Sequence, residues 1–155
     1  MSDIYVLTPN ETEGRIALGL SANDSIDDAD LARRLLALGP ENVVLTLGAR
    51  GVVWACAESI HHLPALEVKI VDTVGAGDAF NAGLATGLSE GRPLAEAITL
   101  GVTAASLSTE RRETIDSYPY SPEVDRAVQD VLGACRDRPA RRRSSLCMMC
   151  PGASS

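Results

Sequence analysis

A glycine-rich turn between a predicted strand and a predicted helix constrains the fold of this chain more than any other feature. Residues 67–71 alternate in polarity and are rich in β-branched side chains, which predicts a strand. Residues 79–88 carry apolar side chains at helical spacing, which predicts a helix. Gly75 and Gly77 therefore lie at the junction, where glycine permits backbone angles and close approaches that a Cβ forbids.

The same turn has the chemistry of an anion site. The start of a helix offers unpaired N–H groups and the positive end of a dipole, and both suit a phosphate. Asp72 and Asp78 bracket the turn, and Asp78 lies beside those N–H groups, where a general base would be well placed. The simpler alternative is a tight turn capped by an aspartate. Because two acids flank a Gly-Ala-Gly sequence, we favour the functional interpretation.

Composition narrows the class of protein. A chain of 155 residues is long enough for one domain with a core, and 3% aromatic residues with abundant Ala, Leu, Val and Gly favour packed α/β layers. The net charge is −7, and residues 136–155 hold five Arg and one Asp, so the acidity lies in the rest of the chain. An acidic body argues against a nucleic-acid partner, although it does not exclude a nucleotide.

Neither a membrane span nor a leader is expected from the sequence. No apolar run reaches the roughly 20 residues of a membrane helix. The N-terminus lacks a basic region followed by an apolar core. The four cysteines (Cys56, Cys135, Cys147 and Cys150) form no spaced framework, which favours a reducing, cytoplasmic setting.

Short strands and helices are predicted on both sides of the turn. Residues 4–8, 42–47 and 52–56 predict strands, and the two glycines between the last two strands fit a hairpin. An amphipathic helix is predicted over residues 26–38, ended by a Gly-Pro pair. Two later helices are predicted over the ranges 94–107 and 121–132, each with proline at its start.

Four side chains outside the turn are interpreted as structural. Trp54 and Cys56 are predicted to be packing residues of a strand. His61 and His62 are adjacent, and neighbouring side chains of a strand point to opposite faces. The two imidazoles are therefore not expected to share one metal ion.

Residues 72–83 read D-T-V-G-A-G-D-A-F-N-A-G, which resembles the C-terminal signature of the ribokinase-like (PfkB) carbohydrate kinases. The resemblance implies an α/β fold with a three-layer, doubly wound sheet, of which this chain is the C-terminal portion. It also implies that Asp78 takes the proton from the substrate hydroxyl that attacks the γ-phosphate of ATP. The backbone of Gly75, Ala76 and Gly77 would then form the anion hole for the charge that develops.

Two further segments resemble the same family. The sequence T-P-N-E-T-E at residues 8–13 resembles an N-x-x-E motif, which implies that Asn10 lies near the ATP phosphates and that Glu13 helps to hold magnesium through water. Asn10 and Thr12 are equally candidate caps for the next helix. The sequence T-L-G-A-R-G resembles the nucleotide loop. The ATP-binding positions implied by the family, besides Asn10, Gly77 and Asp78, are Thr46, Leu47, Gly48, Ala49, Arg50, Gly51 and Val102.

The resemblance also implies a site for a monovalent cation, usually potassium. Ribokinases proper have an Arg-x-Gly-Ala stretch where this chain has Arg-Arg-Glu-Thr at residues 111–114. Backbone carbonyls of any residue can bind a cation, so the site can persist without that glycine. The departure leaves the identity of the sugar open. The residues expected to form the site are Asp72, Val74, Ser108, Arg111, Glu113 and Ser117.

The resemblance covers roughly residues 4–132. We expect residues 1–132 to form the ATP-binding half of a ribokinase-like kinase domain and residues 133–155 to form a basic, disordered tail. Enzymes of this family are about twice as long, and their N-terminal half supplies most sugar contacts. The strand predicted almost at the first residue suggests that something is missing before it.

Two functions follow from the sequence. The first is an ATP- and Mg²⁺-dependent kinase, with K⁺ as a further cofactor, that phosphorylates a hydroxyl of a small sugar or nucleoside. A homodimer is compatible with it. The second is a truncated nucleotide-binding fragment without catalytic activity. Dinucleotide binding is disfavoured, because the glycine spacing continues to Phe80 where a third glycine is needed.

Overall fold

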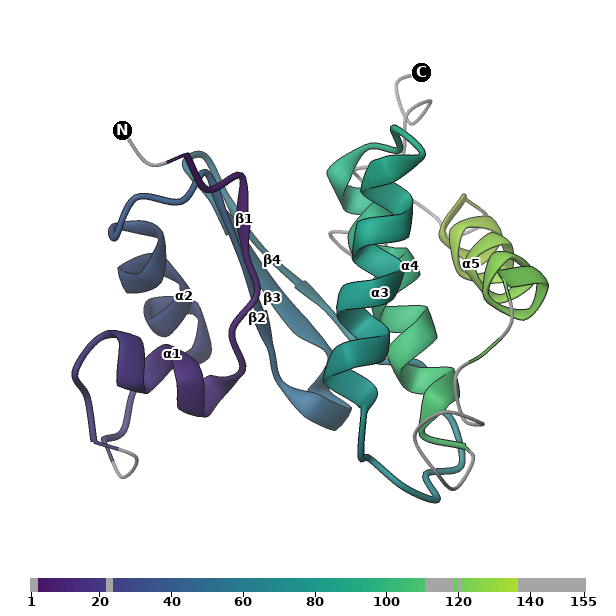
Figure 1. Cartoon of the computed structure of the whole chain (residues 1–155), viewed down its shortest axis with the longest axis horizontal. Coiled ribbons are helices and arrows are strands. Elements are labelled where there is room, and N and C mark those ends of the chain that lie inside the picture. The colour runs from purple at the N-terminus through teal and green to yellow at the C-terminus, as the bar shows by residue number, and fades with distance from the viewer. Residues whose placement is uncertain (1–2, 22–23, 111–118, 120, 137–155) are drawn as a thin grey trace. The chain divides into compact units, whose positions relative to one another are not determined.

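The structure is a computed structural model that describes residues 3–21, 24–110, 119 and 121–136 of the chain (Figure 1). The chain divides into two compact units. Met1–Pro64 is called the sheet unit below, and Ala65–Ser155 is called the helical unit. No helix among the described residues is long and apolar enough to cross a membrane.

The sheet unit has four strands in the order β1-β2-β3-β4. The first pair is parallel and the other two pairs are antiparallel, so the sheet is mixed. Two helices and a 3-10 turn complete the unit, and the predicted α/β class is confirmed. The elements are β1 (Val6–Leu7), α1 (Glu11–Ala17), α2 (Asp28–Leu36), β2 (Asn42–Thr46), η1 (Gly48–Arg50), β3 (Val52–Cys56) and β4 (Ile60–Leu63).

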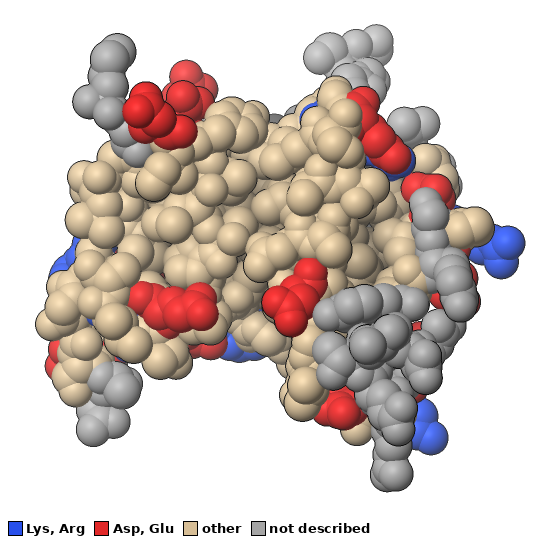
Figure 2. All heavy atoms as spheres, in the orientation of Figure 1, with Lys and Arg blue, Asp and Glu red and all other residues tan. Residues whose placement is uncertain are grey.

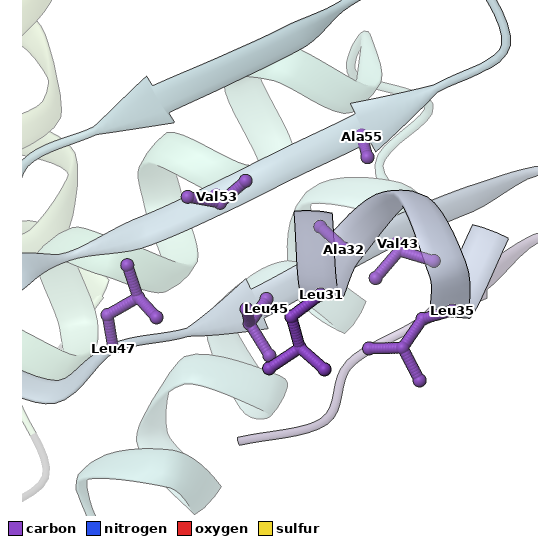
Figure 3. Packing of buried hydrophobic residues seen from close by; sticks show 8 residues of the cluster. All are labelled: Leu31, Ala32, Leu35, Val43, Leu45, Leu47, Val53 and Ala55. Carbon is purple, nitrogen blue, oxygen red and sulfur yellow. The ribbon is translucent and has the colours of Figure 1, made fainter. Parts of the chain in front are cut away.

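The apolar face of α2 packs on β2 and β3. Leu31, Ala32 and Leu35 are fully buried against alternate residues of these strands (Figure 3). Each fully buried leucine of this kind contributes about 1.5–3 kcal/mol. The helix begins where the side chain of Asp27 accepts a hydrogen bond from the Ala29 N–H at 3.0 Å. Because Asp27 caps the helix, α2 starts at Asp28, within the range 26–38 that the sequence predicted.

A buried asparagine joins three strands on the other face of the sheet. Asn42 is 8% exposed; its Nδ2 donates to the Tyr5 carbonyl at 3.1 Å, and its Oδ1 accepts from Trp54 Nε1 at 3.1 Å. The Trp54 ring also lies 5.4 Å from that of His61, centroid to centroid. Because a buried amide is costly unless it is paired, these two bonds fix how β1 and β3 lie beside β2. Trp54 is thus more than a packing residue.

The adjacent histidines behave as the strand pattern predicts. His61 Nε2 lies 2.8 Å from Ser59 Oγ, whereas His62 Nε2 lies 2.8 Å from the backbone carbonyl of Arg50. Cys56, a free thiol, contacts the same serine, with its Sγ 3.3 Å from Ser59 Oγ. The two imidazoles therefore bond different partners.

The strand predicted for residues 67–71 is wrong. The segment is irregular, and its described backbone bonds run to the end of a helix instead of to a strand. Leu66 N donates to Ser106 Oγ at 3.1 Å, and Val71 N donates to the Thr109 carbonyl at 2.7 Å. An alternating, β-branched pattern needs a neighbouring strand to become a ladder, and the described part of the helical unit supplies none to it.

The described part of the helical unit contains three helices, and α3 and α4 are packed at backbone contact. They are α3 (Ala76–Ser89), α4 (Leu94–Ser108) and α5 (Ser121–Arg136). A Cβ added at Gly83 would meet Gly101 Cα at 2.9 Å, and one added at Gly87 would meet Ala97 Cα at 2.8 Å. Two small residues of α4, Ala97 and Gly101, therefore lie at the helix contact. The last helix runs to Arg136, and residues 137–155 lie outside the described part of the chain.

The acidic side chains do not form one continuous patch on the face of the molecule that Figure 2 shows. They occur there as separate groups with uncharged surface between them. The acidic excess of the sequence is therefore spread over this face in small clusters.

We expect Gly83→Ala to lower the free energy of unfolding. Overpacking against the Gly101 backbone costs about 1–3 kcal/mol, which the gain of about 1 kcal/mol for Ala over Gly in a helix offsets only in part. Urea unfolding of the full chain measures the change. Gly77→Ala is the matched control, because no atom lies within 4 Å of a Cβ added there. Equal stability of the two variants would contradict the close contact.

Candidate functional site

The turn at Gly75 opens α3 without a side-chain cap, and the Ala76 N–H donates to the Thr73 carbonyl at 3.3 Å. Gly75 has φ +81° and ψ 0°, a left-handed conformation that favours glycine. It is the N-cap of α3, and no side chain accepts a hydrogen bond at this cap. Since the first N–H groups of a helix lack intrahelical acceptors, this helix start can receive an anion. Gly77, in the first turn, is exposed.

Asp78 lies in that first turn with an exposed side chain. A carboxylate there can be reached by a hydroxyl group of a substrate, and it lies on the same turn as the N–H groups that would stabilise an anion. The arrangement places a proton acceptor and an anion site within one helical turn. The next two residues, Ala79 and Phe80, are buried, so the turn is anchored immediately below its exposed end.

Asp72 shapes the entry to the turn. Its Oδ1 accepts a hydrogen bond from the Val74 N–H at 3.0 Å, which closes a small side-chain turn. Its own N–H and that of Val71 both donate to the carbonyl of Thr109, at 3.1 and 2.7 Å. The first residue after α4 thus holds the start of the glycine-rich turn.

Asn10 and Glu13 form a capping box at the start of α1. The Glu13 N–H donates to Asn10 Oδ1 at 2.9 Å, and the Asn10 N–H donates to Glu13 Oε2 at 2.9 Å. Of the two candidate caps, Asn10 is therefore the one used. The capping box employs one oxygen of each side chain and leaves both residues with exposed surface.

The segment carrying Asn10 lies directly beside the strand that leads into the 46–51 loop. Asn10 and Thr46 form a parallel β-bridge. The Thr46 N–H donates to the Pro9 carbonyl at 2.9 Å, and the Thr46 hydroxyl lies 3.4 Å from the same oxygen. Two of the sequence motifs that resemble the kinase family are thereby brought together at one end of β1 and β2.

The 46–51 loop is a short 3-10 turn with glycine at both ends. Gly48 and Gly51 have φ of +58° and +87°. Leu47 N donates to the Gly51 carbonyl at 2.8 Å, and Gly51 N donates to the Gly48 carbonyl at 3.0 Å. Leu47 and Gly51 are buried while residues 48–50 are exposed, so the loop is anchored at Leu47 and Gly51 and presents its middle at the surface.

Arg50, in this loop, pairs with two helix N-termini. Its Nη2 donates to Glu11 Oε1 at 2.8 Å, and its Nη1 donates to Asp28 Oδ2. The hydrogen bond to Asp28 raises the pKa of the Arg50 guanidinium further, with smaller contributions from Glu11. Sequence reasoning missed this cluster. The only local signal was an acid at the first position of each helix, which dipole effects already explain.

The remaining predicted residues fall in both units. The helical unit holds the glycine-rich turn, Asp72, Val74, Val102 and Ser108, and the sheet unit holds Asn10, Glu13 and the 46–51 loop. Val102 is buried on α4, and the hydroxyl of Ser108 donates to the Ala105 carbonyl at 2.8 Å. Arg111, Glu113 and Ser117 lie outside the described residues, so the monovalent-cation site stays a prediction.

The described residues include no cluster of three or more His, Cys, Asp or Glu side chains arranged for a metal ion. Glu13, predicted to help hold magnesium, uses only its Oε2 in the capping box.

The fold is of the α/β class, and comparison with known proteins gives the family. The model of the pfkB family carbohydrate kinases matches residues 1–120, and the chain belongs to this family. It is 35% identical to the ribokinase of Haemophilus influenzae over 124 residues, which is 80% of this chain and 40% of the relative.

Solved structures give the same result. The ribokinase of Thermotoga maritima matches with a TM-score of 0.73 and 36% identity, over 81% of this chain and 42% of that one. The ribokinase of Arabidopsis thaliana, complexed with ribose and ATP, matches with a TM-score of 0.71 and 28% identity, over 80% and 40% of the two chains. The fold is ribokinase-like, and the chain spans about 40% of the length of these relatives.

We expect Asn10→Ala to lower the free energy of unfolding by about 0.5–2 kcal/mol, because the cap of α1 is lost. Asn10→Asp is the matched variant that retains a capping oxygen and should be near wild-type stability. Thermal or urea unfolding of the full chain measures both. Equal losses in the two variants would contradict the capping role.

Proposed function

We propose that this chain carries the nucleotide-binding and catalytic part of an ATP-dependent carbohydrate kinase, which phosphorylates a hydroxyl of a small sugar or nucleoside. The observation that supports it most is the start of α3. Gly75 opens the helix in a left-handed conformation without a side-chain cap, and Asp78 lies exposed in the first turn of the helix. Membership of the pfkB family supplies the reaction class.

The proposed chemistry uses the carboxylate of Asp78 and the backbone N–H groups that precede it in the same turn. Asp78 accepts the proton of the substrate hydroxyl as its oxygen attacks the γ-phosphorus of ATP, and the bond to the β–γ bridging oxygen breaks to release ADP. Backbone N–H groups of Gly75, Ala76 and Gly77 stabilise the negative charge on the transferring group. Phosphoryl transfer depends mainly on such positioning and charge stabilisation.

The proposed nucleotide contacts come mainly from the sheet unit. Asn10 and the 46–51 loop would face the phosphates and adenosine, and a contact of Val102 with the base stays a prediction. The β-bridge between Asn10 and Thr46 supports this grouping, because it places the two segments side by side. Glu13 would orient water on Mg²⁺, which neutralises phosphate charge when it is bound. The Arabidopsis ribokinase complexed with ribose and ATP supports the choice of ligands.

A second function predicted from the sequence is a nucleotide-binding fragment without catalytic activity. In this alternative the chain binds ATP but transfers no phosphoryl group. The division into an ATP-binding half at residues 1–132 and a tail at residues 133–155 remains a prediction, as do the homodimer and the cytoplasmic location.

We expect Asp78→Asn to reduce phosphoryl transfer by a factor on the order of 10²–10⁴, because an amide cannot accept the proton. The affinity for MgATP should change little. ADP release with a panel of sugars and nucleosides measures transfer, and calorimetry measures binding.

The matched control is Glu96→Gln, which neutralises the first-turn acid of α4 in the same unit. It should leave transfer unchanged. Equal transfer rates for wild type and Asp78→Asn would contradict the role of Asp78. Binding of MgATP without transfer to any acceptor would favour the second function.

A further inference from the structure

Three charged side chains from separate segments of the sheet unit meet at the 46–51 loop. Arg50 belongs to the loop, Glu11 is the first residue of α1, and Asp28 is the first residue of α2. The guanidinium donates to both carboxylates through different nitrogens, with Arg50 Nη2 2.8 Å from Glu11 Oε1. This ion-pair cluster is called the Arg50 clamp below.

We propose that Arg50 is a positioning residue, which holds the 46–51 loop against the first turns of α1 and α2 and does not itself contact the nucleotide. The inference rests on the proposed nucleotide-binding role of the loop. It replaces the direct contact that the family resemblance implied for Arg50 with an indirect one.

The geometry of the guanidinium supports the indirect role. A planar guanidinium presents its donors as a rigid fork, and here its two terminal nitrogens are directed to two carboxylates on two helices. Turning the fork toward a phosphate would leave Glu11 and Asp28 as unpaired negative charges beside a polyanion. The paired arrangement reduces that repulsion, because one of the two negative charges is neutralised.

The backbone of Arg50 is held by a residue outside the clamp. His62 Nε2, on β4, lies 2.8 Å from the Arg50 carbonyl oxygen. Since a carbonyl only accepts, His62 is the donor and Nε2 carries the proton. The side chain of Arg50 is thus fixed by two helices and its carbonyl by a strand. The loop contains two glycines at positive φ, and we infer that such contacts hold it in one conformation.

The two possible roles of Arg50 predict opposite effects when the acids are neutralised. If Arg50 contacted phosphate directly, removing its competing carboxylates would free it and tighten nucleotide binding. If Arg50 acts through the clamp, removing the carboxylates releases the loop and weakens binding, even though negative charge near the phosphates is lost. The sign of the change therefore distinguishes the roles.

The experiment compares MgATP binding by calorimetry on the full chain at low ionic strength. We expect the double variant Glu11→Gln/Asp28→Asn and the single variant Arg50→Ala each to bind MgATP about fivefold more weakly, the scale set by two exposed ion pairs. Adding Arg50→Ala to the double variant should cause no further loss. Arg50→Lys should recover part of the affinity, since one ammonium replaces the fork incompletely.

Arg33→Ala is the matched control. Arg33 pairs with Asp30 on α2 at 3.0 Å, is as exposed as Arg50, and does not belong to the clamp. It should leave MgATP affinity unchanged, and urea unfolding should show every variant folded. Tighter MgATP binding by Glu11→Gln/Asp28→Asn would overturn the proposal.

A second measurement tests the clamp without any nucleotide. The amide protons of Leu47 and Gly51 are bonded within the loop, at 2.8 and 3.0 Å between heavy atoms. Their hydrogen exchange should be several-fold faster in both clamp variants and unchanged in Arg33→Ala. Unchanged exchange in the clamp variants would overturn the proposal. If the wild type bound no MgATP while exchange changed as expected, the proposed nucleotide function would fail and the clamp itself would stand.

Discussion

The short parallel pairing of β1 with β2 is the interaction on which the sheet unit depends. Val6 and Leu7 lie opposite Asn42 and Val43, and the same register continues to the bridge between Asn10 and Thr46. Parallel strands end at the same edge of a sheet, so this register brings two segments that are far apart in the sequence to one place. The capping box, the 46–51 loop and the Arg50 clamp all lie just beyond that edge.

The sequence predicted best what is decided locally. Two glycines between residues 72 and 78 indicated a turn that opens a helix, and Asn10 was one of two candidate caps for the helix that follows it. The sequence failed where the outcome depends on distant partners. Residues 67–71 have a strand pattern, but the bonds of Leu66 and Val71 go to the end of α4, so no strand forms.

The Arg50 clamp shows the same limit. Its two carboxylates are 39 and 22 residues away from the arginine in the sequence. No spacing rule relates these positions, because a helix, a strand and a turn intervene. The family resemblance identified the loop and implies a nucleotide contact for Arg50, but it does not indicate the two carboxylates that pair with this arginine.

Backbone contact between α3 and α4 has a mechanical consequence for the proposed reaction. Gly83 and Gly101 let main-chain atoms of the two helices touch, and main-chain atoms have no rotamers through which a contact can relax. The helix that begins at this turn is therefore held by a rigid contact, which would keep the direction of its first N–H groups during the proposed phosphoryl transfer. A contact made by side chains could relax through a change of rotamer as the charge moves. The main-chain contact between α3 and α4 has little freedom to do so.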